Sequence, residues 1–436
     1  MIIKILISET KKESEHYNKI KEIIENSNNC ITEFIYNNYY YNNNIFKNIK
    51  EKYCNDLIII NNSYSEKIGW ENLKWYGDIN KYIILISDKN IKEKYSHDLI
   101  TYLSTNFSLY NQYSYLYDEL IFENPNIISI FAASKNYIDN KIKISSINFN
   151  KFICNNIEYN FNNSTREFTI NNNNYKIPEQ IYGNTNHPIL SSNGNISKNV
   201  LTIGTTDYTN NFIGTTRGSR IKPDLVFNTE NKYSNSIATA KITNIIINIL
   251  NYIKDNNVKI KLRSDTIKGL LIINAIGSNK GPYHYCGYGI CDINKIKNFI
   301  DNCNTITKII SEYKILHNKR YKIYLKNNIV KVLLIWIDKP SYKIINNINI
   351  YEDRITYKIK FRIKVNNVYY YPYRLNNEKI KNTAINNNYN EIDNVQLIEI
   401  KNCSHFEGII ELDNYGYELE KINYTLLIDY GTIIEE

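Results

Sequence analysis

The sequence predicts an α/β protein with a doubly wound parallel sheet, followed by an antiparallel β-sandwich. The first 135 residues alternate short apolar runs with amphipathic stretches, the pattern of parallel strands joined by helices. After about residue 315 the helical patterns stop, and short runs of alternating apolar and polar residues follow. The chain has 436 residues and is 43% hydrophobic, which is enough to bury more than one core.

The α/β part is expected to begin with five strands. They are Ile2–Ile7, Ile31–Tyr36, Leu57–Ile60, Tyr82–Ile86 and Ile127–Phe131. Between the first two, Glu13–Glu25 places Ile20, Ile23 and Ile24 on one face of a helix. Later elements of this part are the strand Val200–Ile203 and two helices, at about 236–253 and 265–276.

A composition change marks an insertion. Residues 137–180 are short alternating runs separated by Asn-rich turns, which predicts antiparallel β-hairpins. The expected organisation is therefore an N-terminal α/β segment (1–60), an α/β domain (61–312) with its hairpin insertion at 137–180, and a β-sandwich (318–436).

Several classes of protein are excluded by composition. The formal charge of +9 is spread along the chain without a dense basic block, so no nucleic acid partner is expected. No apolar run reaches 18 residues, which predicts no transmembrane helix and no membrane association. The start of the chain lacks the features of a secretory signal, so a cytoplasmic location is expected.

The cysteines predict neither a disulfide framework nor a metal site. Seven Cys are scattered without a CxxC pair. His284, Cys286 and Cys291 are close in sequence, but separate buried thiols are the preferred interpretation. No metal and no cofactor are expected.

Ser234 and Ser236 stand where a long apolar helix begins, after a buried strand and a polar loop. Unsatisfied N–H groups and the helix dipole at such a position favour a developing negative charge, which suits a nucleophile and part of an oxyanion hole. The alternative is that both serines only cap the helix, as Ser often does.

Three motifs place this serine in a wider context. They are Asn199-Val200-Leu201-Thr202-Ile203-Gly204, Arg220-Ile221-Lys222-Pro223-Asp224 and Ser234-Asn235-Ser236-Ile237-Ala238-Thr239-Ala240. Their order and spacing resemble the subtilisin-like serine proteases, with N-V-I-T-V-G, R-I-K-P-D and then the nucleophile motif G-T-S-M-A-T-P at a helix start. The resemblance implies a subtilisin-like fold, a polypeptide substrate or peptide partner, and Ser236 in the nucleophile position.

The resemblance continues downstream. Residues 265–271 are similar to the family's helix that begins I-K-A-A-L, and residues 285–292 to its G-x-G-x-V-x-A closing turn. Residues 332–340 (VLLIWIDKP) and 394–396 (NVQ) resemble two strands of a jelly-roll-like sandwich that follows some subtilase domains. Residues 1–60 also resemble the propeptide that subtilases carry ahead of the catalytic domain.

The family's remaining catalytic residues are an Asp at the end of the first strand and a His that opens the next helix. Three His precede Ser236 and none lies in the family's H-G-T-H motif. In a first alignment Ile83–Ser87 is the first strand, giving Asp88 and His97. In a second it is Leu57–Ile60, which puts Asn61 in place of Asp. In a third it is Ile3–Ile7, giving Glu9 and His16.

The oxyanion position is altered as well. Ile128–Ala133, followed by Ser134-Lys135-Asn136, resembles the family's A-A-G-N strand, so Asn136 or Lys135 is the expected donor. Asn184 is a less favoured alternative. In the nucleophile motif Gly and Thr are replaced by Ser234 and Asn235, and a side chain at 234 crowds a position where Gly allows close approach of substrate.

Three hypotheses follow from these motifs. The first is a degenerate subtilase, weakly active or inactive, that keeps Ser236 and a peptide-binding scaffold. The second is an active serine endopeptidase that uses Ser236 with His97 and Asp88. The third is a non-enzymatic α/β plus β-sandwich interaction protein. If Val200–Ile203 and Ile128–Phe131 are not neighbouring parallel strands, the resemblance to the family fails.

Overall fold

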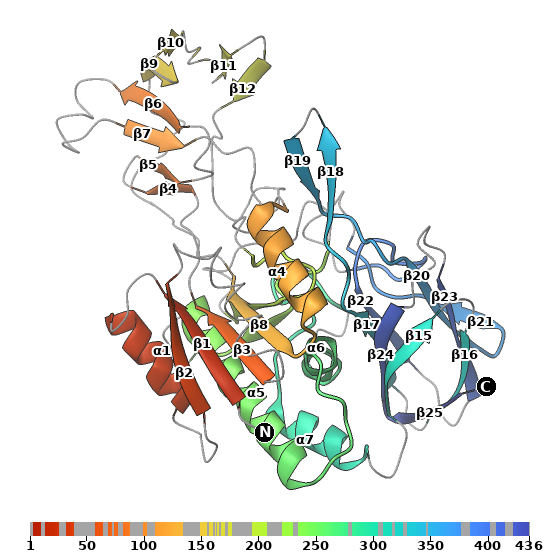
Figure 1. Ribbon diagram of the computed structural model, residues 1–436. Helices are drawn as coiled ribbons and strands as arrows, with labels where there is room; N and C mark the ends of the chain where they lie inside the picture. Colours follow the sequence, from red (N-terminus) through yellow and green to blue (C-terminus); the bar gives the residue numbers. More distant parts are fainter. Residues whose placement is uncertain are drawn as a thin grey trace.

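A computed structural model describes the core elements and part of the connections of this chain (Figure 1). The described residues are 3–9, 14–25, 32–38, 57–63, 69–71, 74–76, 82–87, 99–102, 110–133, 149–154, 157–159, 162, 164, 167–170, 173–176, 194–206, 220–229, 234–277, 281–303, 308–315, 319–325, 329–345, 348–375, 384–401, 407–414 and 422–435.

A six-stranded parallel sheet forms the centre of the α/β domain. Its strands in spatial order are β14 (Leu225–Phe227), β13 (Leu201–Thr205), β8 (Ile127–Ala132), β3 (Leu57–Asn62), β1 (Ile3–Glu9) and β2 (Thr32–Asn38). The strands β8 and β13 are parallel neighbours, with Leu201 opposite Ile130. The resemblance to the family requires this pairing.

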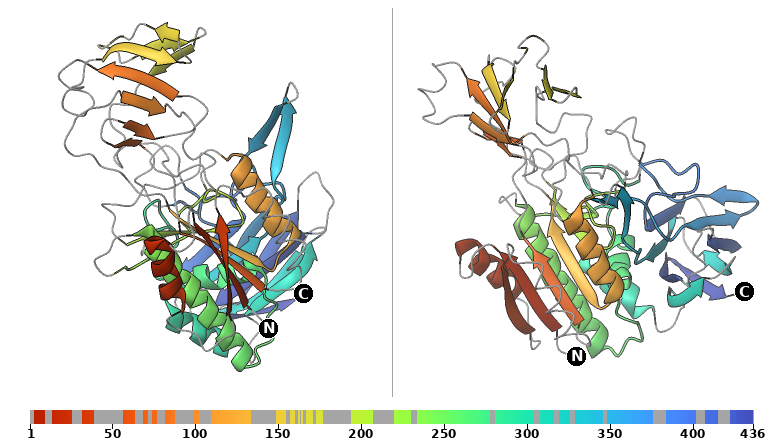
Figure 2. Two further views of the ribbon diagram at one scale, coloured as in Figure 1. Left: turned by 60° about the vertical axis from the view of Figure 1, so that its left-hand side comes forward. Right: turned by 45° about the horizontal axis from the view of Figure 1, so that its top comes forward.

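Helices cover both faces of this sheet, as expected for a doubly wound fold (Figure 2). The helices are α1 (Glu15–Glu25), α4 (Gln112–Glu123), α5 (Asn235–Asp255), α6 (Ser264–Ile273) and α7 (Ile293–Asp301). In β1, Ile3, Ile5 and Ile7 join the core beneath α1 and α5. Leu6 points to the opposite face, where it packs with Leu120 of α4. This alternation is the two-residue period of a strand buried on both faces.

A second, mainly antiparallel sheet is built from two insertions (Figure 1). One insertion follows β3 and contributes β4 (Gly69–Glu71), β5 (Lys74–Tyr76), β6 (Tyr82–Ser87) and β7 (Leu99–Tyr102), of which β5 and β7 pair in parallel. The other follows β8 and contributes β9 (Phe149–Cys154) and β10 (Ile157–Tyr159). Within residues 137–180, β9 pairs antiparallel with β10, and β11 (Glu167–Ile170) with β12 (Asn173–Lys176).

The prediction that Tyr82–Ile86 belongs to the parallel sheet is wrong. This segment is β6, which pairs antiparallel with β7 and β9. An apolar run of six residues does not reveal its partners, because the same run suits either kind of sheet.

Strands β1 and β2 belong to the same sheet as the rest of the α/β domain, because β1 pairs with both β2 and β3. The propeptide comparison and the boundaries near residues 60 and 318 stay predictions.

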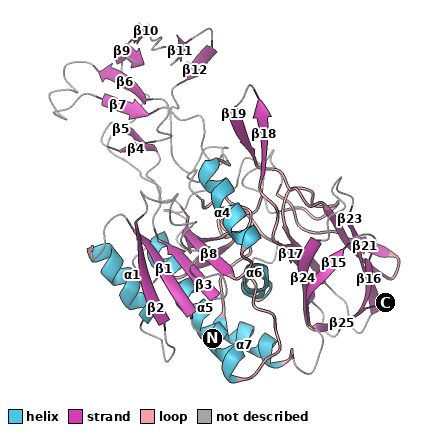
Figure 3. Ribbon diagram, viewed as in Figure 1, coloured by secondary structure: helices cyan, strands magenta, loops and turns pink. Residues whose placement is uncertain are grey.

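Two antiparallel sheets, packed face to face, follow the α/β domain (Figure 3). The first contains β15 (Ile309–Ile315), β24 (Ile422–Asp429), β17 (Ile329–Trp336) and β22 (Val395–Lys401). The second contains β21 (Val368–Tyr370), β20 (Ile359–Val365), β23 (Glu407–Asn414), β16 (Lys319–Leu325) and β25 (Gly431–Glu435). A separate hairpin, β18 (Ser341–Ile345) with β19 (Ile348–Glu352), leaves the first sheet after β17. The predicted class, α/β followed by a β-sandwich, is confirmed, and the jelly-roll-like order stays a prediction.

Strand β17 is buried on both faces, which explains its continuous apolar sequence. Leu334 and Trp336 point into the sandwich core. Leu333 and Ile335 point the other way and pack with the core that contains α6. The sandwich and the α/β domain therefore share an apolar interface through α6.

Gly269 allows α6 to approach this sheet closely. A Cβ atom at this position would lie 2.8 Å from Leu427 Cδ1 and 3.2 Å from Ile335 Cγ2. Extra volume in a packed interface forces side chains or backbone to shift.

We expect Gly269→Ala to lower the free energy of unfolding by about 1–3 kcal/mol, because the added methyl group overlaps Leu427. Urea denaturation followed by circular dichroism measures this effect. Leu427→Ala removes the overlapping atom, so the double variant is expected to lose less than the sum of the two single losses. Additive losses would contradict the proposed contact.

Candidate functional site

Ser236 lies in the first turn of α5, at the edge of the parallel sheet where the strands end. Ser234 is the N-cap residue, and its side chain accepts a hydrogen bond from Ile237 N. Ser236 is half-buried and does not cap the helix. The capping interpretation therefore holds for Ser234, whereas the Ser236 hydroxyl remains available for other contacts.

Two strand ends meet the start of α5. Ser236 Oγ donates to the carbonyl oxygen of Ser63, directly after β3, at 2.5 Å. Asn235 Nδ2 donates to the carbonyl oxygen of Ala133, directly after β8, at 2.7 Å. The C-terminal edge of an open parallel sheet is where α/β proteins usually bind ligands, so these contacts define the candidate site.

No imidazole hydrogen-bonds to Ser236 Oγ within the described part of the chain. The hydroxyl of Ser236 donates to the carbonyl oxygen of Ser63, which cannot take up the proton of a serine hydroxyl. In the geometry described here, Ser236 therefore has no general base.

His16 lies in the first turn of α1, and α1 packs along α5. Asn244 Nδ2 of α5 donates to Ile23 O at 3.0 Å and to Ile24 O at 3.3 Å. Both helices begin at the same edge of the sheet and run away from it. His16 is eight residues before Ile24, and Ser236 is eight residues before Asn244, which is about 12 Å along each helix. The two residues therefore lie at a similar height along the two helices.

The side on which His16 lies is set by helical spacing. Tyr17, Ile20 and Ile24 form the buried face of α1, which packs against the α5 core. His16 is exposed beside this face, and the Ser236 hydroxyl donates to Ser63 O. Glu9 ends β1, the neighbour of β3, so the third alignment brings its residues to the same edge as Ser236.

The first alignment loses its structural basis, because β6 is not a strand of the parallel sheet. Asp88 and His97 follow β6 and lie outside the described residues, so their catalytic roles stay predictions. The expected oxyanion donors Lys135 and Asn136, and the alternative Asn184, also lie outside the described residues.

The sequence motifs at residues 199–204, 220–224 and 285–292 lie together in the structure. Strand β13 pairs with β14, which directly follows the R-I-K-P-D motif. The closing turn donates from Tyr288 N to Asp224 O at 2.9 Å, and its Gly289 O accepts from Val226 N at 3.0 Å. At Gly287, with φ of 55°, a Cβ would lie 2.0 Å from Pro223 O, so only Gly fits this turn.

The charged residues of R-I-K-P-D are buried and paired. Lys222 Nζ lies 2.7 Å from Asp224 Oδ2, and Lys268 Nζ lies 2.9 Å from Asp224 Oδ1. Burial lowers the pKa of Lys222 to about 7, despite the neighbouring carboxylate. Burial alone would raise the pKa of Asp224, but the charges of Lys222 and Lys268 outweigh it and the pKa is lowered.

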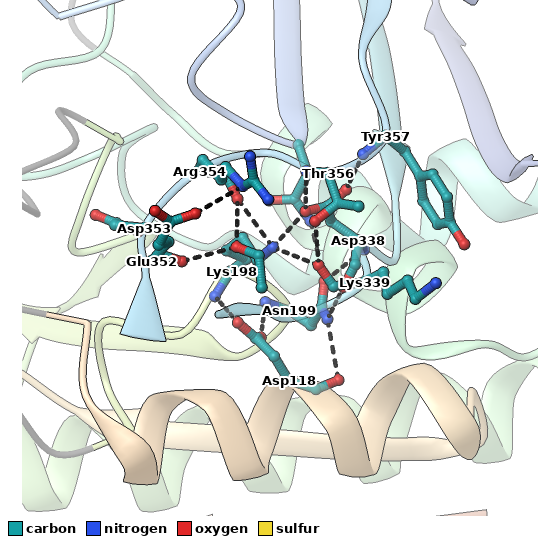
Figure 4. Close-up of polar contacts among 12 residues, drawn as sticks. Asp118, Lys198, Asn199, Asp338, Lys339, Glu352, Asp353, Arg354, Thr356 and Tyr357 are labelled. Atoms are coloured by element: carbon teal, nitrogen blue, oxygen red, sulfur yellow. Dashed lines mark hydrogen bonds and ion pairs between the residues drawn. The ribbon is translucent and has the colours of Figure 1, made fainter. Parts of the chain in front are cut away.

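A second buried pair joins the two domains (Figure 4). Lys198, beside β13, forms an ion pair with Asp338, beyond β17, and both side chains are fully buried. Lys198 Nζ also donates to Lys339 O at 2.7 Å and to Arg354 O at 3.1 Å. The second oxygen of Asp338 accepts from Tyr357 N at 2.8 Å. Both charges are thus compensated by further hydrogen bonds, which a buried pair requires.

Asn199 extends this joint and links three of the sequence motifs. Its Nδ2 donates to Asp338 O at 2.8 Å, and its Oδ1 accepts from Asp338 N at 2.8 Å. Asn394 Nδ2 also donates to Asn199 Oδ1, at 3.2 Å. On the other side, Asp118 of α4 accepts from the backbone N–H groups of Lys198 and Asn199, at 3.0 and 2.8 Å. We name Asp118, Lys198, Asn199 and Asp338 the domain joint.

Sequence reasoning did not identify the domain joint or the role of Ser63. For the joint a signal was present, since Asn199, Asp338 and Asn394 are all motif residues. For Ser63 the sequence shows only a polar residue after an apolar run. Its contact with Ser236 joins positions 173 residues apart.

Two classes of feature are absent from the described residues. They contain no group of three or more His, Cys, Asp or Glu positioned to hold a metal ion. They also contain no helix long and apolar enough to cross a membrane.

Cys286 and Cys291 are free, and burial raises the pKa of their thiols to about 11 and about 12. Such thiols are protonated at neutral pH and weakly nucleophilic.

Comparison with known proteins gives only distant likenesses. No protein-family model matches the chain, and no curated protein matches it. The crystal structure of a lanthipeptide protease is similar at 11% identity and a TM-score of 0.31, covering 68% of this chain and 87% of that one. The crystal structure of tripeptidyl peptidase 2 (TPP II) is similar at 9% identity and a TM-score of 0.33, covering 95% of this chain and 40% of that one. At these scores neither likeness bears on activity.

We expect Lys198→Met to lower the free energy of unfolding by about 3–5 kcal/mol, because it leaves Asp338 buried without its counter-charge. Urea denaturation measures the loss. Lys254→Met, on the exposed surface of α5, is the matched control and is expected to stay within about 0.5 kcal/mol of the wild type. Equal effects of the two substitutions would argue against the domain joint.

Asp393 provides a pH-dependent test of the same region. Burial raises its pKa to about 6, although Arg220 and Lys268 oppose the shift. Because the folded-state pKa lies above the unfolded value, the folded protein binds more protons between about pH 4 and 6, and stability falls as pH rises through this range. Relative to Asp393→Asn, the wild type is expected to lose about 1–3 kcal/mol between pH 4 and 7. Denaturant titrations at several pH values check the sign, and a constant or rising difference contradicts it.

Proposed function

We propose that this chain is a subtilisin-like peptidase homologue that binds polypeptide at the C-terminal edge of its parallel sheet and hydrolyses peptide bonds weakly or not at all. The observation that carries the proposal is the hydrogen bond from Ser236 Oγ to the Ser63 carbonyl oxygen. It combines the position of a nucleophile, at the start of a helix, with a partner that cannot serve as a base.

The polar surroundings of Ser236 support the silent form. A serine hydroxyl becomes a useful nucleophile only when a base lies within about 2.6–3.2 Å. Asn235 and Ser234, which replace Thr and Gly of the family motif, are both engaged in holding α5: one bonds to Ala133 O and the other caps the helix. These residues therefore contribute to the scaffold around the serine.

An active peptidase is the second candidate, and the level arrangement of α1 and α5 favours it. His16 and Ser236 stand in the first turns of neighbouring helices that are fixed to each other by Asn244. In this candidate Glu9, at the end of β1, takes the place of the family's Asp.

A fluorophosphonate probe, which labels activated serines, tests the proposal. We expect the folded wild-type protein to be labelled no faster than Ser236→Ala, because no base among the described residues bonds to the Ser236 hydroxyl. Labelling is quantified by intact-protein mass spectrometry, with circular dichroism to confirm that each sample is folded. Binding of polypeptide is measured on the same samples by the fluorescence anisotropy of fluorescein-labelled casein, which is expected to rise.

The other outcomes identify the alternative. Labelling that is lost in Ser236→Ala and in His16→Ala establishes the active candidate with His16 as the base. Labelling that is lost in His97→Ala instead returns the role to His97 and Asp88. If the folded protein is not labelled and does not bind casein, the proposal is rejected.

A further inference from the structure

Asn61, the residue before the last of β3, is fully buried and hydrogen-bonded at both ends of its amide. Its Nδ2 donates to Thr243 Oγ1 at 2.7 Å, and its Oδ1 accepts from Ser63 Oγ at 2.6 Å. Thr243 in turn donates to Thr239 O at 2.9 Å, within α5. The amide is therefore held between the end of β3 and the second and third turns of α5.

Ser63 connects Asn61 to Ser236. Besides its bond to Asn61, Ser63 Oγ lies 3.2 Å from Ser236 O, to which it can also donate. The carbonyl oxygen of Ser63 accepts from Ser236 Oγ. Ser63 is 2% exposed, so its contacts are shielded from competing water. The two serines are thus connected by both side chain and backbone.

We propose that Asn61 is a positioning residue for the Ser236 hydroxyl and acts through Ser63. This inference rests on the proposed function for the identity of position 236, but it needs no catalytic activity.

The direction of the amide is what makes the arrangement specific. Thr243 Oγ1 already gives its proton to Thr239 O, so it can only accept from Asn61, which fixes Nδ2 on that side. Oδ1 then faces Ser63 and holds its hydroxyl. A reversed amide would leave buried polar groups unpaired, which is costly.

The arrangement has a chemical consequence for the group at position 236. A hydrogen bond donated to a carbonyl oxygen stabilises the protonated form of the donor. The contact with Ser63 O therefore keeps the hydroxyl protonated and directed away from solvent. If the contacts of Asn61 are lost, Ser63 is held less firmly. Its carbonyl oxygen then stabilises the protonated form of the group at position 236 less strongly.

A thiol at position 236 makes this effect measurable without peptidase activity. In Ser236→Cys, the rate of alkylation by iodoacetamide is followed at that position by peptide mass spectrometry, between pH 6 and 10. Peptides containing Cys286 and Cys291 are quantified in the same samples as internal references. The measured quantities are the rate at pH 8 and the midpoint of the pH–rate profile, because the thiolate is the reactive form.

Two substitutions in the Ser236→Cys background remove the contacts of Asn61. They are Asn61→Leu, which removes both hydrogen bonds, and Thr243→Val, which removes only the partner of Nδ2. Asn62→Leu is the matched control. Asn62 is equally buried but faces the other side of the sheet, where it bonds to Ser129 Oγ at 3.1 Å and to Tyr117 OH at 3.1 Å.

We expect both Asn61→Leu and Thr243→Val to accelerate alkylation at position 236 about three- to tenfold, the factor for loss of one hydrogen bond. The midpoint of the pH–rate profile should move to lower pH, and Asn62→Leu should change neither quantity. Unchanged rates in folded Thr243→Val overturn the inference, even if Asn61→Leu fails to fold. An equal acceleration in Asn62→Leu also overturns it, since general loosening of the sheet would then explain the effect.

The alkylation experiment and the fluorophosphonate experiment can fail separately. A protein that no fluorophosphonate labels can still show the alkylation pattern, which would support the positioning role alone. A protein that is labelled at Ser236 without the alkylation pattern would keep the peptidase and reject the role of Asn61.

Discussion

The ion pair between Lys198 and Asp338 is the constraint on which the arrangement of the two domains depends. Each charge lies in the interior at the place where the domains meet, and each would be costly there alone. The α/β domain supplies one partner and the β-sandwich the other, so neither domain has a satisfactory interior without its neighbour. The apolar contact of α6 with β17 adds to this dependence, since β17 is buried on both faces. The protein therefore has one continuous interior.

The organisation of the site follows from the same interior. The start of α5 is tied to the end of β3 through Ser63 and to the end of β8 through Ala133. Its N-terminal turn is thus fixed to two neighbouring strands through the side chains of Asn235 and Ser236, while Ser234 caps the helix. These side chains contribute to the structure of the sheet edge, and the partner of the Ser236 hydroxyl is a backbone carbonyl.

Much of the fold could be predicted from local patterns. Apolar runs and helical spacing located β1, β3, β8, β13, α1 and α5 within a few residues, because the apolar residues in each follow the pattern of a buried strand or an amphipathic helix. The assignment of β6 failed, since a short apolar run carries no information on its partners. The position of Ser236 followed from its motif. Its partner Ser63 did not, because a hydrogen bond between two ordinary polar residues far apart in sequence leaves no local pattern.

The candidate base shows the same limit. Sequence order allowed three alignments, and spacing alone favoured none of them. The fold separates the first alignment from the other two, since β1 and β3 are strands of the parallel sheet while β6 is not. The position of His16 relative to Ser236 depends on how α1 lies along α5. The hydrogen bond from Asn244 to Ile23 O fixes one point of contact between these two helices. A tertiary contact in the middle of a helix therefore determines the geometry at its end.

The two insertions both begin where a parallel strand ends, beside β3 and beside β8 (Figure 1). Lengthening a surface connection adds little entropic cost to folding. Changes of sequence or length in these insertions can therefore alter the surroundings of this sheet edge, while the buried contacts of β3, β8 and α5 stay unchanged.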